Sequence, residues 1–194
     1  MAFISPSSRR IDILRPLLAL CLFWCGTLFA AEGIHVQSAE ISRNGGDYYL
    51  DANFDVELTH TLETALNKGL PLHFLIEFEL TRPRWYTLYL WNRSVLEFEQ
   101  HYRLSYNALT RQYRLSVGAL HQNLDTLGDA LALMGRLRPR LLAPVDALDE
   151  GKVYEAAIRM RLDVSQLPKP LQINALASRD WNLASAWFRW TLTP

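Results

Sequence analysis

Two pairs of glutamates have a spacing that could support acid–base chemistry. Glu77 and Glu79, and likewise Glu97 and Glu99, stand two residues apart in segments typical of β-strands, so each pair shares one strand face. Glycoside hydrolysis uses two carboxylates of unequal pKa, roughly 5 Å apart in retaining enzymes. Both pairs alternate with apolar residues, which is typical of a solvated sheet face with cross-strand ion pairs. The arginines expected beside them are Arg82, Arg84, Arg93, Arg103 and Arg111. We expect surface glutamates, and a glycan- or peptidoglycan-acting hydrolase is the alternative.

No other motif indicates catalysis or metal binding. The histidines stand singly, without HxH or HExxH spacing, at positions 35, 60, 73, 101 and 121. Neither a G-x-S-x-G elbow nor a phosphate-cradling glycine pattern occurs. The acidic stripe of Asp51, Asp55 and Glu57 lacks the dense loop spacing of calcium sites. We therefore expect no catalytic residue, no metal site and no cofactor.

An aromatic and basic segment runs from Arg82 to Arg93. Pro83 interrupts regular strand pairing there. Tryptophan, tyrosine and arginine dominate the hot spots of protein interfaces, so this segment is the candidate binding surface. Its residues are Arg82, Arg84, Trp85, Tyr86, Tyr89 and Trp91. The alternative is that Trp85 and Trp91 close one end of the core.

The first thirty residues have the layout of a secretory signal peptide. Arg9, Arg10 and Arg15 precede an apolar run, and small residues follow it around Ala30. The run is about fifteen residues long, whereas a membrane span needs roughly 20. We expect cleavage after Ala30, a single domain over residues 31–194 and a periplasmic location, with a retained membrane anchor as the alternative. No later apolar run is long enough to span a membrane.

The charge balance changes when the leader is removed. The whole chain has 194 residues, 20 Lys+Arg, 20 Asp+Glu and two cysteines. The leader contains three of the arginines, one aspartate and both cysteines, which leaves a mildly acidic chain without thiol chemistry or disulfides. A nucleic-acid binder needs an excess of Lys and Arg, so we expect no nucleic-acid partner.

The mature chain has the pattern of strands with two short helices. Alternating apolar residues predict strands over 34–41, 48–58, 71–81, 85–91, 95–106, 111–117, 152–164, 171–175 and 181–192. Spacings of three and four predict one helix around 62–66, closed by Gly69, and another from about 125 to Gly135. Because hairpin turns join most strands, the pattern indicates a mainly β fold, an antiparallel β-sandwich or strongly curved sheet. We expect Trp181, Trp187 and Trp190 in its core.

Four segments in this order resemble the uncharacterised DUF4390 family. They are Thr81–Tyr86, Tyr102–Arg114, Leu162–Gln172 and Trp181–Trp190. The resemblance implies an exported proteobacterial protein of about this length, from a family whose genes often neighbour a membrane histidine-kinase pair. It implies no activity, ligand or functional residue.

These observations favour a non-enzymatic, exported binding or accessory module that contacts an envelope or membrane-sensor protein. The hydrolase is one alternative. A carrier that holds a small apolar molecule or lipid inside the sheet is the other, since β domains of this size often contain an apolar cavity.

Overall fold

In the computed structural model the chain divides into two units, residues 1–31 and 32–194, and the structure describes residues 33–83 and 93–194. Its strands are β1 (Ile34–Asn44), β2 (Asp47–Val56), β3 (Leu72–Arg82), β4 (Arg93–Asn107), β5 (Gln112–Val117), β6 (Leu120–Leu124), β7 (Arg136–Pro144), β8 (Tyr154–Leu162) and β9 (Phe188–Leu192). The helices are α2 (His60–Asn67), α3 (Leu127–Met134) and α4 (Lys169–Ala177), with short 3-10 turns at Val145–Ala147, Val164–Gln166 and Arg179–Trp181.

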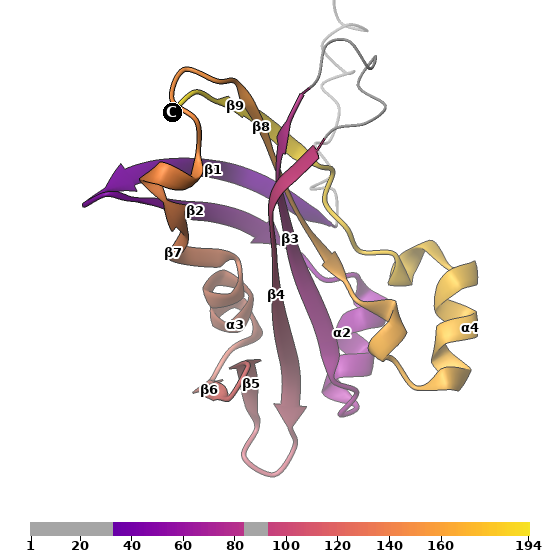
Figure 1. Cartoon of the computed structure of the whole chain (residues 1–194). Coiled ribbons are helices and arrows are strands. Elements are labelled where there is room, and N and C mark those ends of the chain that lie inside the picture. Colours follow the sequence, from indigo (N-terminus) through magenta and orange to yellow (C-terminus); the bar gives the residue numbers. More distant parts are fainter. Residues whose placement is uncertain (1–32, 84–92) are drawn as a thin grey trace, which may run out of the picture. The chain divides into compact units, whose positions relative to one another are not determined.

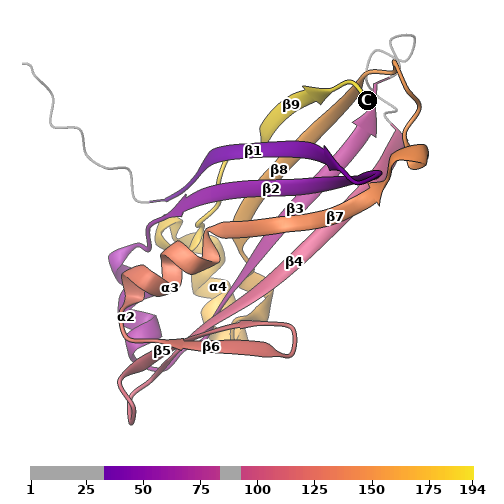
Figure 2. The same cartoon turned by 90° about the vertical axis from the view of Figure 1, so that its left-hand side faces the viewer.

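The strands form two antiparallel sheets that pack together (Figure 1). The small sheet has the order β1-β2-β7, and the large sheet has the order β6-β5-β4-β3-β8-β9. β1 packs against β8 and β9, and Figure 2 shows the small sheet lying over one face of the large one. The mainly β fold expected from the sequence is confirmed.

The core lies between the two sheets and follows from the alternation of apolar residues. Tyr48, Leu50, Ala52, Phe54 and Val56 of β2 are all buried, and the intervening residues are not. The large sheet contributes the matching face of β3 and β8, in which each side chain is at most 3% exposed: Phe74, Ile76, Phe78, Leu80, Ala156, Ile158, Met160 and Leu162. A strand with period two must bury one whole face, so this alternation fixes the register of both sheets.

Local signals define the turns and the first two helices. Gly45 and Gly46 have φ values of 62° and 99° between β1 and β2, a conformation that other residues rarely adopt. The Thr59 hydroxyl accepts from the Leu62 N–H at 3.3 Å at the start of α2. The Thr126 hydroxyl does the same for the Asp129 N–H at 3.1 Å at the start of α3. Both predicted helices are therefore confirmed, within one or two residues of their predicted ends.

The prediction for the C-terminal segment is partly wrong. The segment 171–175 was expected to be a strand, but it lies within α4, and the closing strand spans only Phe188–Leu192. Pro170 stands in the first turn of α4, where its missing N–H costs nothing, so it begins a helix rather than ending an element. Ile173 is 73% exposed and Ala175 is buried, which is a helical surface rather than a strand face.

Some strands and tryptophans differ from the expectations drawn from the sequence. β6 and β7 were not predicted, and the predicted strand 85–91 lies outside the described residues. Trp181 is buried, whereas Trp187 and Trp190 are partly buried, and only Trp190 belongs to β9. Within the residues that the structure describes, no helix has the length and apolar character needed to cross a membrane.

Candidate functional site

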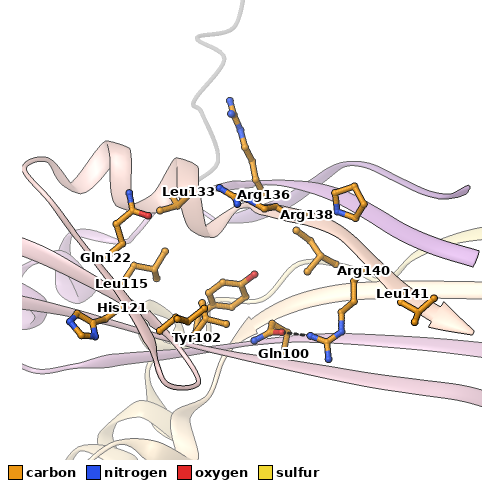
Figure 3. Close-up of a pocket in the computed structure, with 14 residues that line it drawn as sticks. Gln100, Tyr102, Leu115, His121, Gln122, Leu133, Arg136, Arg138, Arg140 and Leu141 are labelled. Atoms are coloured by element: carbon orange, nitrogen blue, oxygen red, sulfur yellow. Dashed lines mark hydrogen bonds between the residues drawn. The ribbon is translucent and has the colours of Figure 1, made fainter. Parts of the chain in front are cut away.

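A hollow of about 560 Å³ opens beside β7, and we call it the β7 hollow (Figure 3). It is lined from β4 by Gln100 and Tyr102, from the β5–β6 hairpin by Leu115, Val117, Leu120, His121 and Gln122, from α3 by Leu133, and from β7 by Arg136, Leu137, Arg138, Pro139, Arg140 and Leu141. The small sheet has three strands and ends at β7, whereas the large sheet continues through β4, β5 and β6. The hollow therefore lies where the small sheet no longer covers the inner face of the large one.

The floor of the hollow is apolar and its rim is exposed. Tyr102, Leu115 and Leu137 are each less than 10% exposed. Leu120 and Leu141 at the rim are 78% and 55% exposed. Known ligand pockets have volumes of roughly 300–1,000 Å³, apolar walls and a few oriented polar groups, and the β7 hollow fits that description.

A bulge in β7 directs one arginine toward the large sheet. Leu137 pairs with Ala52 and Arg140 pairs with Leu50, so three residues of β7 span two of β2. Directly opposed residues share a sheet face, and Leu50 and Ala52 face the core. Without the extra residue, strict alternation from Leu137 would turn Arg140 to the outer face. The bulge therefore re-aims Arg140 inward, which is a frequent use of β-bulges.

The Arg140 guanidinium is held by two neutral groups of β4. It donates to Gln100 Oε1 at 2.7 Å (Figure 3). It also lies 4.1 Å from the centre of the Phe98 ring. Burial raises the pKa of the nearby Tyr102 hydroxyl, while the positive charge of Arg140 acts in the opposite direction. Tyr102 is thus a neutral hydroxyl at neutral pH, and Arg140 supplies the positive charge beside it.

Arg136 and Arg138 also line the hollow from β7, and we call these two residues and Arg140 the arginine edge. Among the residues that the structure describes, no aspartate or glutamate lines the β7 hollow. The described carboxylates also form no ion pair with Arg136, Arg138 or Arg140. Arg140 is turned inward by the bulge, whereas Arg136 pairs with Asn53 and stands on the outer face of the small sheet, at the border of the hollow. Together the three positive charges give this edge of the hollow a positive field.

The start of β7 is fixed by a close backbone contact. The Gly135 carbonyl accepts from the Phe54 N–H at 2.7 Å, and the Gly135 N–H donates to Leu131 O at 2.8 Å. A β-carbon at Gly135 would lie 2.2 Å from Phe54 O. The close approach of α3 to β2 therefore requires glycine at this position. Because Arg136 is the next residue, the contact also fixes where β7 and its arginines start.

The glutamate pairs lie on the opposite, outward face of the large sheet. Glu77 pairs in register with Glu99, and Glu79 with Glu97, so the four carboxylates face one another across β3 and β4. Glu77 is held in a network by two arginines, because Arg159 binds one of its oxygens and Arg161 binds the other at 3.0 Å. Glu99 lies 3.6 Å from the His101 imidazole, and both side chains are exposed.

The charge state of Glu77 follows from that network. Burial would raise the pKa of Glu77, but the hydrogen bonds and charges of Arg161 and Arg159 outweigh it and hold the pKa below its usual range. Arg159 also lies 4.4 Å from the centre of the Trp187 ring. A general acid needs a raised pKa, so the surroundings of Glu77 are the reverse of what acid catalysis requires. The arginines of this network, from β8, were not the ones expected from the sequence.

A second, small hollow of about 200 Å³ lies on that outward face. It is lined by Arg103, Ser105, Arg114, Ser116, Gly118, Ala119, Leu120 and His121. Arg103 stands opposite Ser116, and Ser105 stands opposite Arg114. Arg114 donates to Asn123 Oδ1 at 3.0 Å, so part of its donor capacity is already used.

The histidines do not form a metal site in the described part of the chain. No group of three or more His, Cys, Asp or Glu side chains with metal-binding geometry occurs among residues 33–83 and 93–194. Burial lowers the pKa of His73, Arg103 lowers it further and Asp163 opposes them, so His73 is neutral at neutral pH.

The binding surface predicted from the sequence falls mostly outside the described residues. Arg84, Trp85, Tyr86, Tyr89 and Trp91 are among them. Arg82 is described, and it forms an exposed ion pair with Asp149 at 2.8 Å.

Sequence reasoning missed the residues of the β7 hollow. The segment Arg136-Leu137-Arg138-Pro139-Arg140 carries a signal, because three arginines alternate with an apolar residue and a proline. That pattern is typical of an edge strand, in which charge and proline prevent further pairing.

The fold and the site define a class, a two-sheet, mainly β protein with an arginine-edged apolar hollow. The family model described as "Domain of unknown function (DUF4390)" matches residues 31–191. The chain therefore belongs to the DUF4390 family, which confirms the resemblance found in the sequence. No curated protein and no solved structure matches the chain.

Proposed function

We propose that this DUF4390 protein is an exported, non-catalytic binding module that takes an apolar ligand into the β7 hollow. The observation that carries the proposal is the hollow itself, about 560 Å³ with a floor of buried apolar side chains. A ligand that covers this floor gains roughly 25 cal/mol for each Å² of apolar surface removed from water.

The location beyond the inner membrane belongs to the same proposal. It is supported by the basic, apolar and small-residue pattern of the first thirty residues. Expression of the full chain followed by mass spectrometry of the exported fraction tests it. The expected mature chain begins at Ala31, and a product that retains Met1 in the membrane fraction would contradict cleavage.

An accessory role beside an envelope or membrane-sensor protein is also proposed. Leu120 and Leu141 at the rim are large, exposed apolar residues, and such residues gathered around a pocket are frequent at interaction sites. A photo-crosslinking residue at position 120 should capture an envelope protein in cells, whereas one at the exposed Val153 should not. Equal capture at both positions would remove the rim as the contact.

Binding to the hollow is tested with a neutral apolar dye. N-phenyl-1-naphthylamine fluoresces when it leaves water, and it carries no charge that the arginines could attract. We expect a saturable signal with one site per chain of residues 31–194. Val117 lines the hollow, so Val117→Trp should fill it and reduce binding of the dye at least tenfold.

The matched control is Val153→Trp, the same substitution at a residue that is 52% exposed. It should leave dye binding unchanged. Leu120→Trp at the exposed rim provides a second blocking variant that does not disturb the core. No saturable binding by the wild-type chain, or full binding by both folded blocking variants, would overturn the proposal.

A further inference from the structure

We infer that the ligand of the β7 hollow is an anionic amphiphile, with an apolar body on the floor and an acidic head group at the arginine edge. This inference rests on the proposed function and names its ligand class. The head group is a carboxylate, sulfate or phosphate, since all three are planar or tetrahedral oxyanions that guanidinium groups bind with paired N–H donors.

The lining of the hollow carries positive charge. Arg136, Arg138 and Arg140 line the hollow, and within the described part of the chain no carboxylate does. The bulge of β7 lies opposite Asp51 of β2, but that carboxylate forms no ion pair with any of the three. A cationic ligand would meet the like charge of Arg140 and the positive field of Arg136 and Arg138 at the border, whereas an anionic head group supplies the counter-charge.

The geometry of Arg140 suits a bound anion. A guanidinium has five N–H donors, and the contact to Gln100 Oε1 uses one of them. The Phe98 ring supports the plane of the group at 4.1 Å and leaves its edge available. Arg140 is therefore oriented by neutral neighbours while most of its donors remain for a ligand, in a position beside the buried Tyr102.

The edge of β7 and the shape of the hollow favour a small amphiphile over a peptide strand. The unpaired edge of β7 could in principle accept an extended peptide. However, Pro139 has no N–H to donate, and the pairing of β7 with β2 shifts register twice, so β7 is not a regular template for another strand. The hollow beside it has an apolar floor and a bounded volume, which fits a compact ligand.

The test compares ligands that share one ten-carbon chain. Decanoate and decyl phosphate carry the acidic head group, decanol carries none, and decyltrimethylammonium carries the opposite charge. Acetate and inorganic phosphate supply the head group without the chain. Displacement of N-phenyl-1-naphthylamine from the chain of residues 31–194, checked by calorimetry, gives each affinity.

We expect decanoate and decyl phosphate to bind at least tenfold more tightly than decanol, and decyltrimethylammonium to bind most weakly. The advantage of decanoate should shrink as sodium chloride rises from 50 to 500 mM, because salt screens the attraction. Comparison of decanoate with decyl phosphate then distinguishes a carboxylate from a phosphate head group.

Substitution of all three arginines by glutamine should remove the advantage of decanoate over decanol. The matched control replaces Arg43, Lys68 and Lys152 by glutamine, since these three exposed residues do not line the hollow and the net charge changes equally. The control variant should keep the full advantage. The binding of decanol should be the same in both variants and in the wild type.

Each other outcome overturns a specific statement. Equal affinity for decanoate and decanol, or loss of the decanoate advantage in the control variant, refutes the anionic head group while the hollow stays a binding site. Acetate or inorganic phosphate binding as tightly as decanoate refutes the apolar body. An acidic peptide that binds when the decyl compounds do not also refutes the inference. Failure of the uncharged dye and of every decyl compound refutes the proposed function itself.

Discussion

The backbone contact at Gly135 gives a sharp test of how α3 is joined to the small sheet. Gly135 has φ −68°, an ordinary helical value, so an alanine there meets no conformational barrier of its own. Its β-carbon, however, would lie 2.2 Å from Phe54 O. Real contacts of this kind are longer, so the two backbones must separate by about 1 Å.

The cost of Gly135→Ala can be estimated from what that separation breaks. The hydrogen bond from the Phe54 N–H to the Gly135 carbonyl contributes about 0.5–1.5 kcal/mol. Overpacking at a tight contact adds about 1–3 kcal/mol. We therefore expect a loss of about 2–4 kcal/mol in the free energy of unfolding, which lowers the Tm by roughly 5–15 °C in a domain of this size.

Gly128→Ala in the same helix is the matched control. The added β-carbon at Gly128 would have its nearest neighbour, Thr126 Oγ1, at 4.0 Å. Alanine is favoured over glycine in a helix by up to about 1 kcal/mol, so this variant should be unchanged or slightly more stable. Urea unfolding followed by circular dichroism measures both. If Gly135→Ala lies within about 0.5 kcal/mol of the wild type, or if the two variants are equally destabilised, the close-contact argument is wrong.

Three further predictions concern the core and the charged residues. Phe74→Ala should lower the free energy of unfolding by about 3–5 kcal/mol, measured by urea titration, because Phe74 is fully buried between the sheets and its loss leaves a cavity. Glu77→Gln should cost about 1–3 kcal/mol at pH 7, since it leaves two arginines without their carboxylate, while the exposed Glu79→Gln should change little. The pKa of Glu77 is below its usual 4.5, so the wild type should lose stability as the pH falls below that value, and over that same range Glu77→Gln should show a shallower loss. Arg82→Ala should change the Tm by no more than about 3 °C, because its ion pair with Asp149 joins side chains that are 42% and 64% exposed and such pairs contribute at most about 1 kcal/mol.

The fold followed from the sequence wherever a short segment decides its own structure. The alternation of Tyr48, Leu50, Ala52, Phe54 and Val56 predicted β2 and its buried face, because a strand turns every second residue to the same side. The segment 171–175 shows the limit of that rule. Its apolar residues alternate as in a strand, but they belong to α4, whose first turn contains Pro170.

The sequence predicted that ion pairs form on the face that contains Glu77, but it did not predict which arginines form them. Spacing along β3 indicated an exposed glutamate face with cross-strand ion pairs. The actual partners, Arg159 and Arg161, lie more than 80 residues away on β8. The order of strands in the large sheet brings them alongside β3, and no local pattern specifies that order.

The sequence by itself therefore determined the elements that local physics controls, namely the alternating strands and the first two helices, and it indicated the family to which the chain belongs. Only the tertiary structure decided where a site could form. The β7 hollow exists because a three-stranded sheet covers a six-stranded one incompletely, and Arg140 faces it because one extra residue in β7 shifts its pairing with β2. Both are properties of long-range pairing, in which the register between distant strands, rather than the residues of one segment, sets the direction of each side chain.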